Sequence, residues 1–422
     1  MTLLPGAASG DAGARQDGGP PGRVYGRGGT AHRAAGTLLA PSRAPYLPRD
    51  LPRAAAAPRP ARALLGALVC YAGVRALGLV VLAARSAGEG HSAHTLLAAR
   101  WDALWYTRVV EQGYDFTLVA PDGRTLSDMA FFPLFPWLEG GVAEAFGLSG
   151  ADAGLVVTAV ASVAAAAGIH ATAHRLAGAR PAFLCVVLWA ALPVGIVQSM
   201  AYTESLFTAL AAWALYATLR ERWLLAGVLA SLAGLTRPTG LAVACAVLAG
   251  AVVAARRQGV RADALAGVVL APLGACAYVL WVGARTGGVF GYLAVQRGWG
   301  NGFDGGLAFA RFTAALLRGP GVFAGVGLLA GVGLLLYAYG LGFRARYPAA
   351  VQTYTGVVLL VALGSSGYFG SKPRLLMPAF TVLLPLAGAL ARRWRTAAAV
   401  CAAAAVGSAV YGALWLNGSG PP

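Results

Sequence analysis

Apolar runs long enough to cross a lipid bilayer recur from about residue 63 to the end of this chain. The first run, residues 63–84, reads ALLGALVCYAGVRALGLVVLAA. A membrane-spanning helix needs about 20 mostly apolar residues. Charged residues make up only 12% of the chain, whereas soluble proteins have roughly 25%. The sequence therefore predicts an all-α polytopic membrane protein and argues against a large soluble helical protein.

The distribution of charge predicts which side of the membrane each loop faces. Segment 86–130 has three Arg and six acidic residues, net −3, whereas basic clusters separate many of the later apolar runs. Because cytoplasmic loops carry an excess of Lys and Arg, 86–130 is expected outside and the N-terminus inside. Run 131–147 has two Glu and two Pro, and a crossing there would reverse the pattern. It is expected to be an interfacial or re-entrant helix, and 307–318 is expected along the interface.

About eleven membrane-spanning helices follow from this interpretation, with the C-terminus outside. They are expected near residues 64–85, 152–174, 181–198, 205–219, 223–236, 238–254, 262–284, 320–342, 349–366, 375–391 and 396–416. Together they form a transmembrane domain over 63–416, followed by a tail over 417–422.

The segment before the first span differs in composition from the rest of the chain. Residues 1–62 are rich in Gly, Ala, Pro and Arg, with nine Arg against three Asp and no apolar period. They are expected to be a disordered basic arm on the cytoplasmic side. Arginines at the ends of spans explain most of the net charge of +17, so no nucleic-acid partner is expected. The five cysteines lie inside apolar runs without metal-ligand spacing, so no metal site is expected.

Charge and aromatic side chains concentrate where the first outside loop begins. The stretch RWDALWY, residues 100–106, places Asp102 between Trp101 and Trp105, with Tyr106 four residues further on. In a helix Asp102 and Tyr106 would share one face. A carboxylate held among aromatics at a membrane interface is well placed to act as a base. The alternative is an aromatic belt with solvated charges.

Three further polar groups lie at the outside ends of spans. Glu204 opens an apolar helix, Arg237 lies in a Pro-broken turn, and Lys372 and Arg374 precede a later span. Ionisable groups at membrane depth suggest a functional site, and two cations beside a membrane suit a lipid phosphate. The alternatives are helix capping for Glu204, a snorkelling side chain for Arg237 and a misassigned loop for Lys372 and Arg374.

Five sequence blocks resemble, in order, the PIG-V-type mannosyltransferases, which are membrane glycosyltransferases of the GT-C class. The blocks are RWDALWYTRVVEQGY, AFFPLFPWL, SMAYTESLF, GLTRPTG and SKPRLLMPAF, between about residues 98 and 380. The resemblance implies a GT-C-like fold, a mannose donor carried on a polyprenyl phosphate and a reaction on the non-cytoplasmic face. It also implies that Asp102, the acidic residue after the first span, is catalytic.

The Arg- and Ala-rich composition is typical of a high-GC bacterium, so a multi-pass protein of a bacterial plasma membrane is expected. The eukaryotic members of the family extend the glycosylphosphatidylinositol anchor, which such bacteria do not make, so the acceptor is left open. It is a glycan, a lipid or a protein hydroxyl. The other expected partners are the polyprenyl-phosphate sugar and membrane lipids.

The predicted function is transfer of mannose from polyprenyl phosphate to an acceptor hydroxyl, with inversion and without cofactor or metal. A departing phosphate needs its charge neutralised, and the acceptor hydroxyl needs a base. One alternative is a GT-C transferase that uses arabinose or glucose or acts on protein, and another is a flippase for lipid-linked sugars. The expected roles are Asp102 as base; Glu111 and Glu204 in support; Arg237, Lys372 and Arg374 on the phosphate; and Trp101, Trp105, Tyr106, Phe131, Phe132, Pro133 and Tyr202 on sugar and lipid.

Overall fold

The computed structural model describes residues 60–418 and residue 420. The predicted basic arm lies outside the described residues except at 60–62, which belong to the first helix. The first helix therefore begins slightly earlier than the predicted domain boundary. Pro60 is the first residue of that helix, a position where proline is tolerated because the missing N–H would have no partner.

The described residues are mostly helical, with two short antiparallel strand pairs, one of them a hairpin. The α-helices are α1 (Pro60–Gly88), α2 (Ala93–Ala98), α3 (Asp102–Gln112), α4 (Leu134–Phe146), α5 (Gly150–Ala177), α6 (Ala179–Ala190), α7 (Glu204–Leu219), α8 (Trp223–Gly234), α9 (Gly240–Gln258), α10 (Ala262–Leu270), α11 (Leu273–Thr286), α12 (Gly291–Gly298), α13 (Leu307–Arg318), α14 (Val322–Arg344), α15 (Ala349–Gly364), α16 (Lys372–Leu376), α17 (Leu384–Leu390) and α18 (Trp394–Leu416). The 3₁₀ turns are η1 (Asp128–Ala130), η2 (Gly195–Ser199), η3 (Phe369–Ser371) and η4 (Phe380–Leu383). The strands are β1 (Thr117–Val119), β2 (Thr125–Ser127), β3 (Gly302–Phe303) and β4 (Ser365–Ser366).

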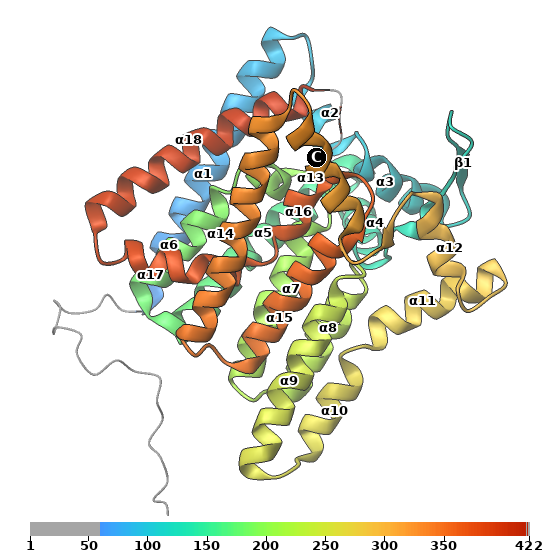
Figure 1. Cartoon of the computed structure of the whole chain (residues 1–422). Helices are drawn as coiled ribbons and strands as arrows, with labels where there is room; N and C mark the ends of the chain where they lie inside the picture. The colour runs from blue at the N-terminus through green and yellow to red at the C-terminus, as the bar shows by residue number, and fades with distance from the viewer. Residues whose placement is uncertain (1–59, 419, 421–422) are drawn as a thin grey trace, which may run out of the picture. The chain divides into compact units, whose positions relative to one another are not determined.

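Small residues let the central helices approach closely. Helix α5 packs along α7, α9 packs against α15, and α1 packs against α18 (Figure 1). At Gly168 of α5, an added Cβ would lie 3.0 Å from the Cβ of Ala212 in α7. Membrane helices associate through such small-residue contacts because lipid provides no hydrophobic drive between them. The high Ala and Gly content therefore serves tight helix packing.

The membrane-spanning character of the helices agrees with the apolar pattern. Among the described residues, six helices are long and apolar enough to cross a membrane, and a seventh candidate is the bent pair Phe369–Leu376 and Phe380–Leu390. Three shorter apolar helices, α6, α8 and α15, accompany them. This confirms a polytopic helical membrane fold, while the total of eleven spans stays a prediction.

Several of the expected spans are not one continuous helix. Within 262–284, α10 ends at Leu270 and α11 begins at Leu273. A bend of 71° lies between Phe369–Leu376 and Phe380–Leu390, within the expected span 375–391.

The run 181–198 was expected to be helical throughout, but α6 ends at Ala190 and the chain continues as an unwound segment, 191–203, that includes η2. Pro193 accounts for the break, because proline cannot donate to the helix ladder and disfavours helical geometry in the preceding residue. The unwound segment leads directly into Glu204.

The loop between α3 and α4, which the sequence predicts to lie outside, folds against a projecting arm formed by α11 and α12. Strands β1 and β2 pair antiparallel, with Leu118 opposite Leu126. Tyr278 of α11 donates a hydrogen bond to the Phe131 carbonyl oxygen at 2.6 Å, which ties the arm to this loop. Figure 1 shows the hairpin, α11 and α12 on the same side of the helices. The segment expected to be an interfacial helix forms α4, which is not among the candidate spans.

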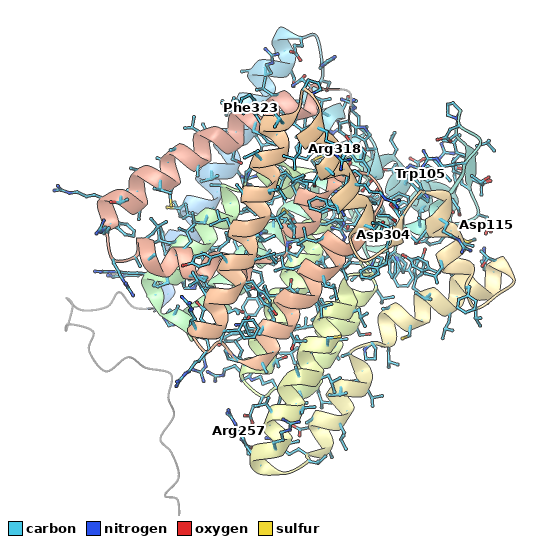
Figure 2. The ribbon with its side chains drawn as sticks, in the orientation of Figure 1. Trp105, Asp115, Arg257, Asp304, Arg318 and Phe323 are labelled. Atoms are coloured by element: carbon cyan, nitrogen blue, oxygen red, sulfur yellow. The ribbon has the colours of Figure 1, made fainter. Side chains whose placement is uncertain are left out.

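The residues labelled in Figure 2 mark the two ends of the helices. Figure 2 places Arg257, from a cluster predicted to be cytoplasmic, at the end opposite to Trp105 and Arg318. The end of α18 lies beside the first outside loop, because Arg100 donates a hydrogen bond to the Leu416 carbonyl oxygen at 3.0 Å. The C-terminal end of α18 and the Asp102 loop therefore lie on one face.

Candidate active site

Four charged side chains from four separate segments meet at one place. They are Asp102 at the start of α3, Glu204 at the start of α7, Arg237 in the α8–α9 turn, and Arg374 in α16. Arg374 Nη1 lies 2.7 Å from Asp102 Oδ2, and its Nε lies 3.4 Å from Glu204 Oε1. Arg237 Nη1 lies 2.6 Å from the same Glu204 oxygen. The result is a chain of ion pairs in which Glu204 joins the two arginines; we call these four residues the charge cluster.

The two carboxylates of the charge cluster differ in their exposure to solvent. The Asp102 side chain is 24% exposed and each arginine side chain is 12% exposed, whereas Glu204 is 1% exposed. A group that takes a proton from a substrate must be reachable by that substrate. Asp102 meets this requirement, and Glu204 lies beneath the arginines as their buried counter-ion.

A strained turn delivers Asp102 to this position. Trp101 has φ +51°, a conformation that non-glycine residues rarely adopt. The Arg100 guanidinium lies 4.0 Å from the centre of the Trp101 ring, and the same arginine is bonded to α18. The backbone N–H of Asp102 donates to Tyr202 Oη at 3.3 Å. Strain of this kind persists where the surroundings hold it, and here it places Asp102 at the first position of α3.

Tyrosines join α3 to the unwound segment before α7. Tyr106 Oη donates to Thr203 Oγ1 at 3.4 Å, and the Arg374 guanidinium lies 5.1 Å from the centre of the Tyr202 ring. Burial, together with the negative charges of Asp102 and Glu204, raises the pKa of Tyr106 well above its usual value. Tyr106 is therefore a neutral, buried phenol beside the charge cluster, on the same helix as Asp102.

The remaining predicted aromatic residues fall into two packed groups. Trp105 stacks on Phe131 with ring centres 5.6 Å apart and meets Trp299 edge-on at 4.9 Å. Phe132 belongs to a different cluster, where it packs against Tyr278. Pro133, also buried, precedes α4. Phe132 and Pro133 thus lie in the protein interior, and their expected role of guiding a lipid tail stays a prediction. Trp299 is absent from the predicted site residues, because its loop carries only a weak motif.

Two predicted polar residues lie outside the charge cluster. Glu111 is an exposed residue nine positions after Asp102 on α3, which at 1.5 Å per residue corresponds to about 13 Å along the helix. Lys372 Nζ donates to the carbonyl oxygens of Ala362 at 2.8 Å and Ser365 at 2.6 Å. Those oxygens belong to the C-terminal end of α15, where free carbonyls favour a cation. Lys372 therefore holds the C-terminal end of α15, and its expected contact with the donor phosphate stays a prediction.

An apolar groove borders the same region. It has a volume of about 400 Å³ and lies between α13, α14 and α15, with Phe309, Leu336, Tyr339 and Leu363 among its lining residues. The Phe309 ring centre is 5.5 Å from Lys372 Nζ. The groove therefore reaches the segment that carries Arg374. Among residues 60–418 and 420, no three His, Cys, Asp or Glu side chains cluster as metal ligands.

A second buried carboxyl group lies where α3, α4 and α5 meet. Glu139 of α4 is buried, and Thr107 Oγ1 donates to its Oε1 at 3.0 Å. An added Cβ at Gly154 would lie 3.1 Å from Glu139 Oε2, so α5 leaves room for the carboxyl group only by carrying glycine there. Burial, reinforced by the negative charge of Glu111, raises the pKa of Glu139 from 4.5 to about 8.

Stability is expected to fall with rising pH because of Glu139. Between pH 4.5 and about 8 the folded protein keeps this proton while the unfolded chain releases it, so folding loses on the order of 1 kcal/mol per pH unit from this group. Glu139→Gln should remove this part of the slope in thermal unfolding measured from pH 5 to 8. Glu144→Gln, exposed on the same helix, is the matched control. An unchanged slope in Glu139→Gln would contradict the assignment.

The family comparison overlaps the middle of the chain. Residues 130–281 match the family described as dolichyl-phosphate-mannose-protein mannosyltransferase. The matched region is well under half of the chain. It contains Glu204 and Arg237, but it excludes Asp102 and Arg374. No curated protein matches the sequence.

The fold has similar solved structures. One is ArnT from Cupriavidus metallidurans bound to undecaprenyl phosphate, with TM-score 0.50 and 16% identity, covering 78% of this chain and 62% of ArnT. Others are the Archaeoglobus fulgidus oligosaccharyltransferase with zinc and sulfate (TM-score 0.48, 12% identity, 83% and 53% covered) and the same organism's AglB with an inhibitory peptide and dolichol phosphate (TM-score 0.44, 13% identity, 83% and 56% covered). The chain spans less than two thirds of the length of these proteins. The likeness to ArnT confirms the expected GT-C-like helical membrane fold.

Proposed function

We propose that this chain, a membrane protein with a GT-C-like fold, is a glycosyltransferase that uses a polyprenyl-phosphate-linked sugar. The observation that carries the proposal is the charge cluster, in which the accessible carboxylate of Asp102 pairs with Arg374, and the buried Glu204 joins Arg374 to Arg237. We further propose that the sugar is mannose, that Asp102 is the base, and that the reaction inverts the anomeric carbon on the extracytoplasmic face of a bacterial plasma membrane.

The reaction needs one base and a site for a departing anion. The acceptor oxygen attacks the anomeric carbon while Asp102 takes its proton. The bond between that carbon and the phosphate oxygen breaks, and its electron pair leaves with the polyprenyl phosphate. A phosphodiester with one negative charge thereby becomes a phosphate monoester with two. Guanidinium groups aimed at developing charge are an efficient way to stabilise it, and phosphate departs without needing a proton donor.

Arg374 links the two halves of this mechanism. It pairs with Asp102 and lies close to Glu204. A donor phosphate would share this guanidinium, which leaves the Asp102 carboxylate free to take the proton of the acceptor hydroxyl. Arg237, held by Glu204 at 2.6 Å, supplies the second positive charge. The apolar groove beside Phe309 would receive the polyprenyl tail.

Support for the donor class comes from the relatives. The family that matches residues 130–281 is described by a dolichyl-phosphate-mannose donor, and the similar ArnT structure contains undecaprenyl phosphate. The PIG-V-like sequence blocks contribute Asp102, Glu204, Arg237 and Arg374, all four members of the charge cluster. Mannose is the sugar that the PIG-V resemblance and the family description share.

A protein acceptor is the second candidate, because the matched family is described as acting on protein. A transferase that acts on protein and one that acts on a glycan or lipid would use the same donor. They would differ only in the hydroxyl group that accepts the sugar. Both place the same demand on Asp102, and both leave Glu204 as the counter-ion of the two arginines.

The test is sugar transfer by membranes that contain the chain, supplied with radiolabelled polyprenyl phosphomannose. Parallel reactions receive the arabinose and glucose donors, and membranes without the chain are the control. We expect label to move from the donor into a lipid, glycan or protein fraction with release of polyprenyl phosphate. Transfer from another sugar alone would overturn mannose as substrate. An intact donor in all three reactions would overturn the transferase.

A further inference from the structure

The arginine in the middle of the first membrane-spanning helix has no acidic partner among the described residues. Arg75 is a buried residue of α1, yet its guanidinium forms no ion pair there. Instead it donates hydrogen bonds to the backbone carbonyl oxygens of Ala190 and Gly195. A charged side chain within a membrane span is costly and is rarely kept without a function. The contacts indicate what that function is.

Arg75 binds where a helix is broken. Ala190 is the last residue of α6, and Gly195 begins η2 in the unwound segment 191–203. Carbonyl groups at the end of a helix lack intrahelical partners and carry a partial negative charge. Ser408 of α18 donates to a third carbonyl oxygen, that of Leu192, at 2.6 Å. Side chains from α1 and α18 thus satisfy the polar backbone that the helix break exposes.

Gly195 shows how closely this contact is fitted. A Cβ added there would lie 2.7 Å from the Ala190 oxygen, 2.8 Å from Arg75 Nη2 and 2.9 Å from Ser408 Oγ. Those separations are shorter than real Cβ contacts, so a larger residue would push the guanidinium away from the carbonyl oxygens. Arg75 and Gly195 form one fitted unit, which we call the α1 clamp.

The far end of the unwound segment carries the charge cluster. The Ala201 N–H donates to the Leu97 carbonyl oxygen at 3.0 Å, just before α3. Tyr202 Oη accepts the Asp102 N–H at 3.3 Å. Glu204 follows and pairs with both arginines. One segment is therefore held by the clamp at its start and holds Asp102 at its end.

We propose that Arg75 is a positioning residue, which fixes segment 191–203 so that Tyr202 and Glu204 hold Asp102 and Arg374 in their reacting arrangement. Arg75 acts through the segment and touches no substrate. The expected loss of sugar transfer rests on the proposed function. The expected loosening of segment 191–203 rests on the backbone contacts alone. A misplacement of about 1 Å at a reacting group costs about 10²-fold in rate, which sets the expected size of the effect.

The test compares Arg75→Met, Arg75→Lys and Gly195→Ala with wild type in proteoliposomes. Arg85→Met is the matched control, because Arg85 lies on α1 but is exposed and pairs with Glu89. We expect Arg75→Met and Gly195→Ala to lower kcat by about 10²-fold while KM for the donor changes little. Arg75→Lys should keep part of the rate, since an ammonium can still donate to one carbonyl oxygen.

Hydrogen exchange separates this inference from the proposed function. In Arg75→Met, amides of 191–203 should exchange at least about tenfold faster, with those of α14 unchanged. If wild type transfers no sugar, the exchange result alone decides whether the clamp exists. If Arg75→Met fails to fold, Gly195→Ala and Arg75→Lys carry both measurements. Unchanged kcat and unchanged exchange in the folded variants would overturn the inference.

Discussion

Asp102→Asn is expected to lower the rate of sugar transfer by about 10³-fold, within the range that a positioned general base contributes. Asparagine has the same shape and can still accept a hydrogen bond from Arg374, but it cannot take a proton from the acceptor hydroxyl. The effect should therefore appear in kcat, with little change in KM for the donor. Initial rates at saturating donor, on equal amounts of folded protein, measure it.

The matched control for this prediction is Asp115→Asn. Asp115 lies in the same outside loop and pairs with Arg285 at 2.6 Å, but both side chains are largely exposed. An exposed pair contributes about 1 kcal/mol or less, so activity should stay close to wild type. Asp102→Glu should give an intermediate rate, because the carboxylate is kept but displaced. Full activity in Asp102→Asn would exclude Asp102 as the base.

Glu204→Gln is expected to destabilise the folded protein by about 3–5 kcal/mol, the usual result of removing one partner from a buried ion pair. Glu204 is 1% exposed and is the shared counter-ion of Arg237 and Arg374. Its neutral replacement leaves two adjacent guanidinium groups that repel each other in a poorly solvated site. Thermal unfolding in detergent, compared with wild type at the same lipid content, measures the loss.

Two variants test whether this loss comes from uncompensated charge. Glu221→Gln removes a carboxylate that is exposed and lies 3.7 Å from Arg261, so its effect should be below about 1 kcal/mol. The double variant Glu204→Gln with Arg237→Gln should be more stable than the sum of the two single effects implies. Strict additivity would show that Glu204 stabilises the protein in some way other than by pairing with Arg237.

The structure shows which residues of the resemblance blocks meet, which the sequence alone does not predict. The charge cluster draws its residues from four of the five blocks, and the sequence alone gives no reason to group these four. The residues are Asp102, Glu204, Arg237 and Arg374. Their ion pairs select them as a group, and the same contacts leave Glu111 and Lys372 outside it. The sequence does not single out Arg75, because one arginine in an apolar run suggests no partner until the break in α6 is known.

The aromatic residues also show that the sequence alone does not predict which side chains pack together. Phe131 and Phe132 are adjacent in the sequence, and the sequence predicts the same role for both. They point into different clusters, one with Trp105 near the charge cluster and one with Tyr278 on the α11 arm. Successive side chains leave the backbone in different directions, so the partner of each is set by whichever helix packs there.

The sequence by itself determined that the chain is a polytopic helical membrane protein, because a bilayer forces long apolar segments to satisfy their own backbone as helices. The GT-C-like fold was implied by the resemblance of its sequence blocks to the PIG-V-type family. The sequence also determined which residue types could carry the chemistry. Only the tertiary structure decided which of them share one site, where α6 breaks, and that Arg75 holds the break. Those outcomes depend on contacts such as the one between Arg75 and Gly195, 120 positions apart, and no local pattern encodes the direction in which a helix presents its polar side chains to a distant partner.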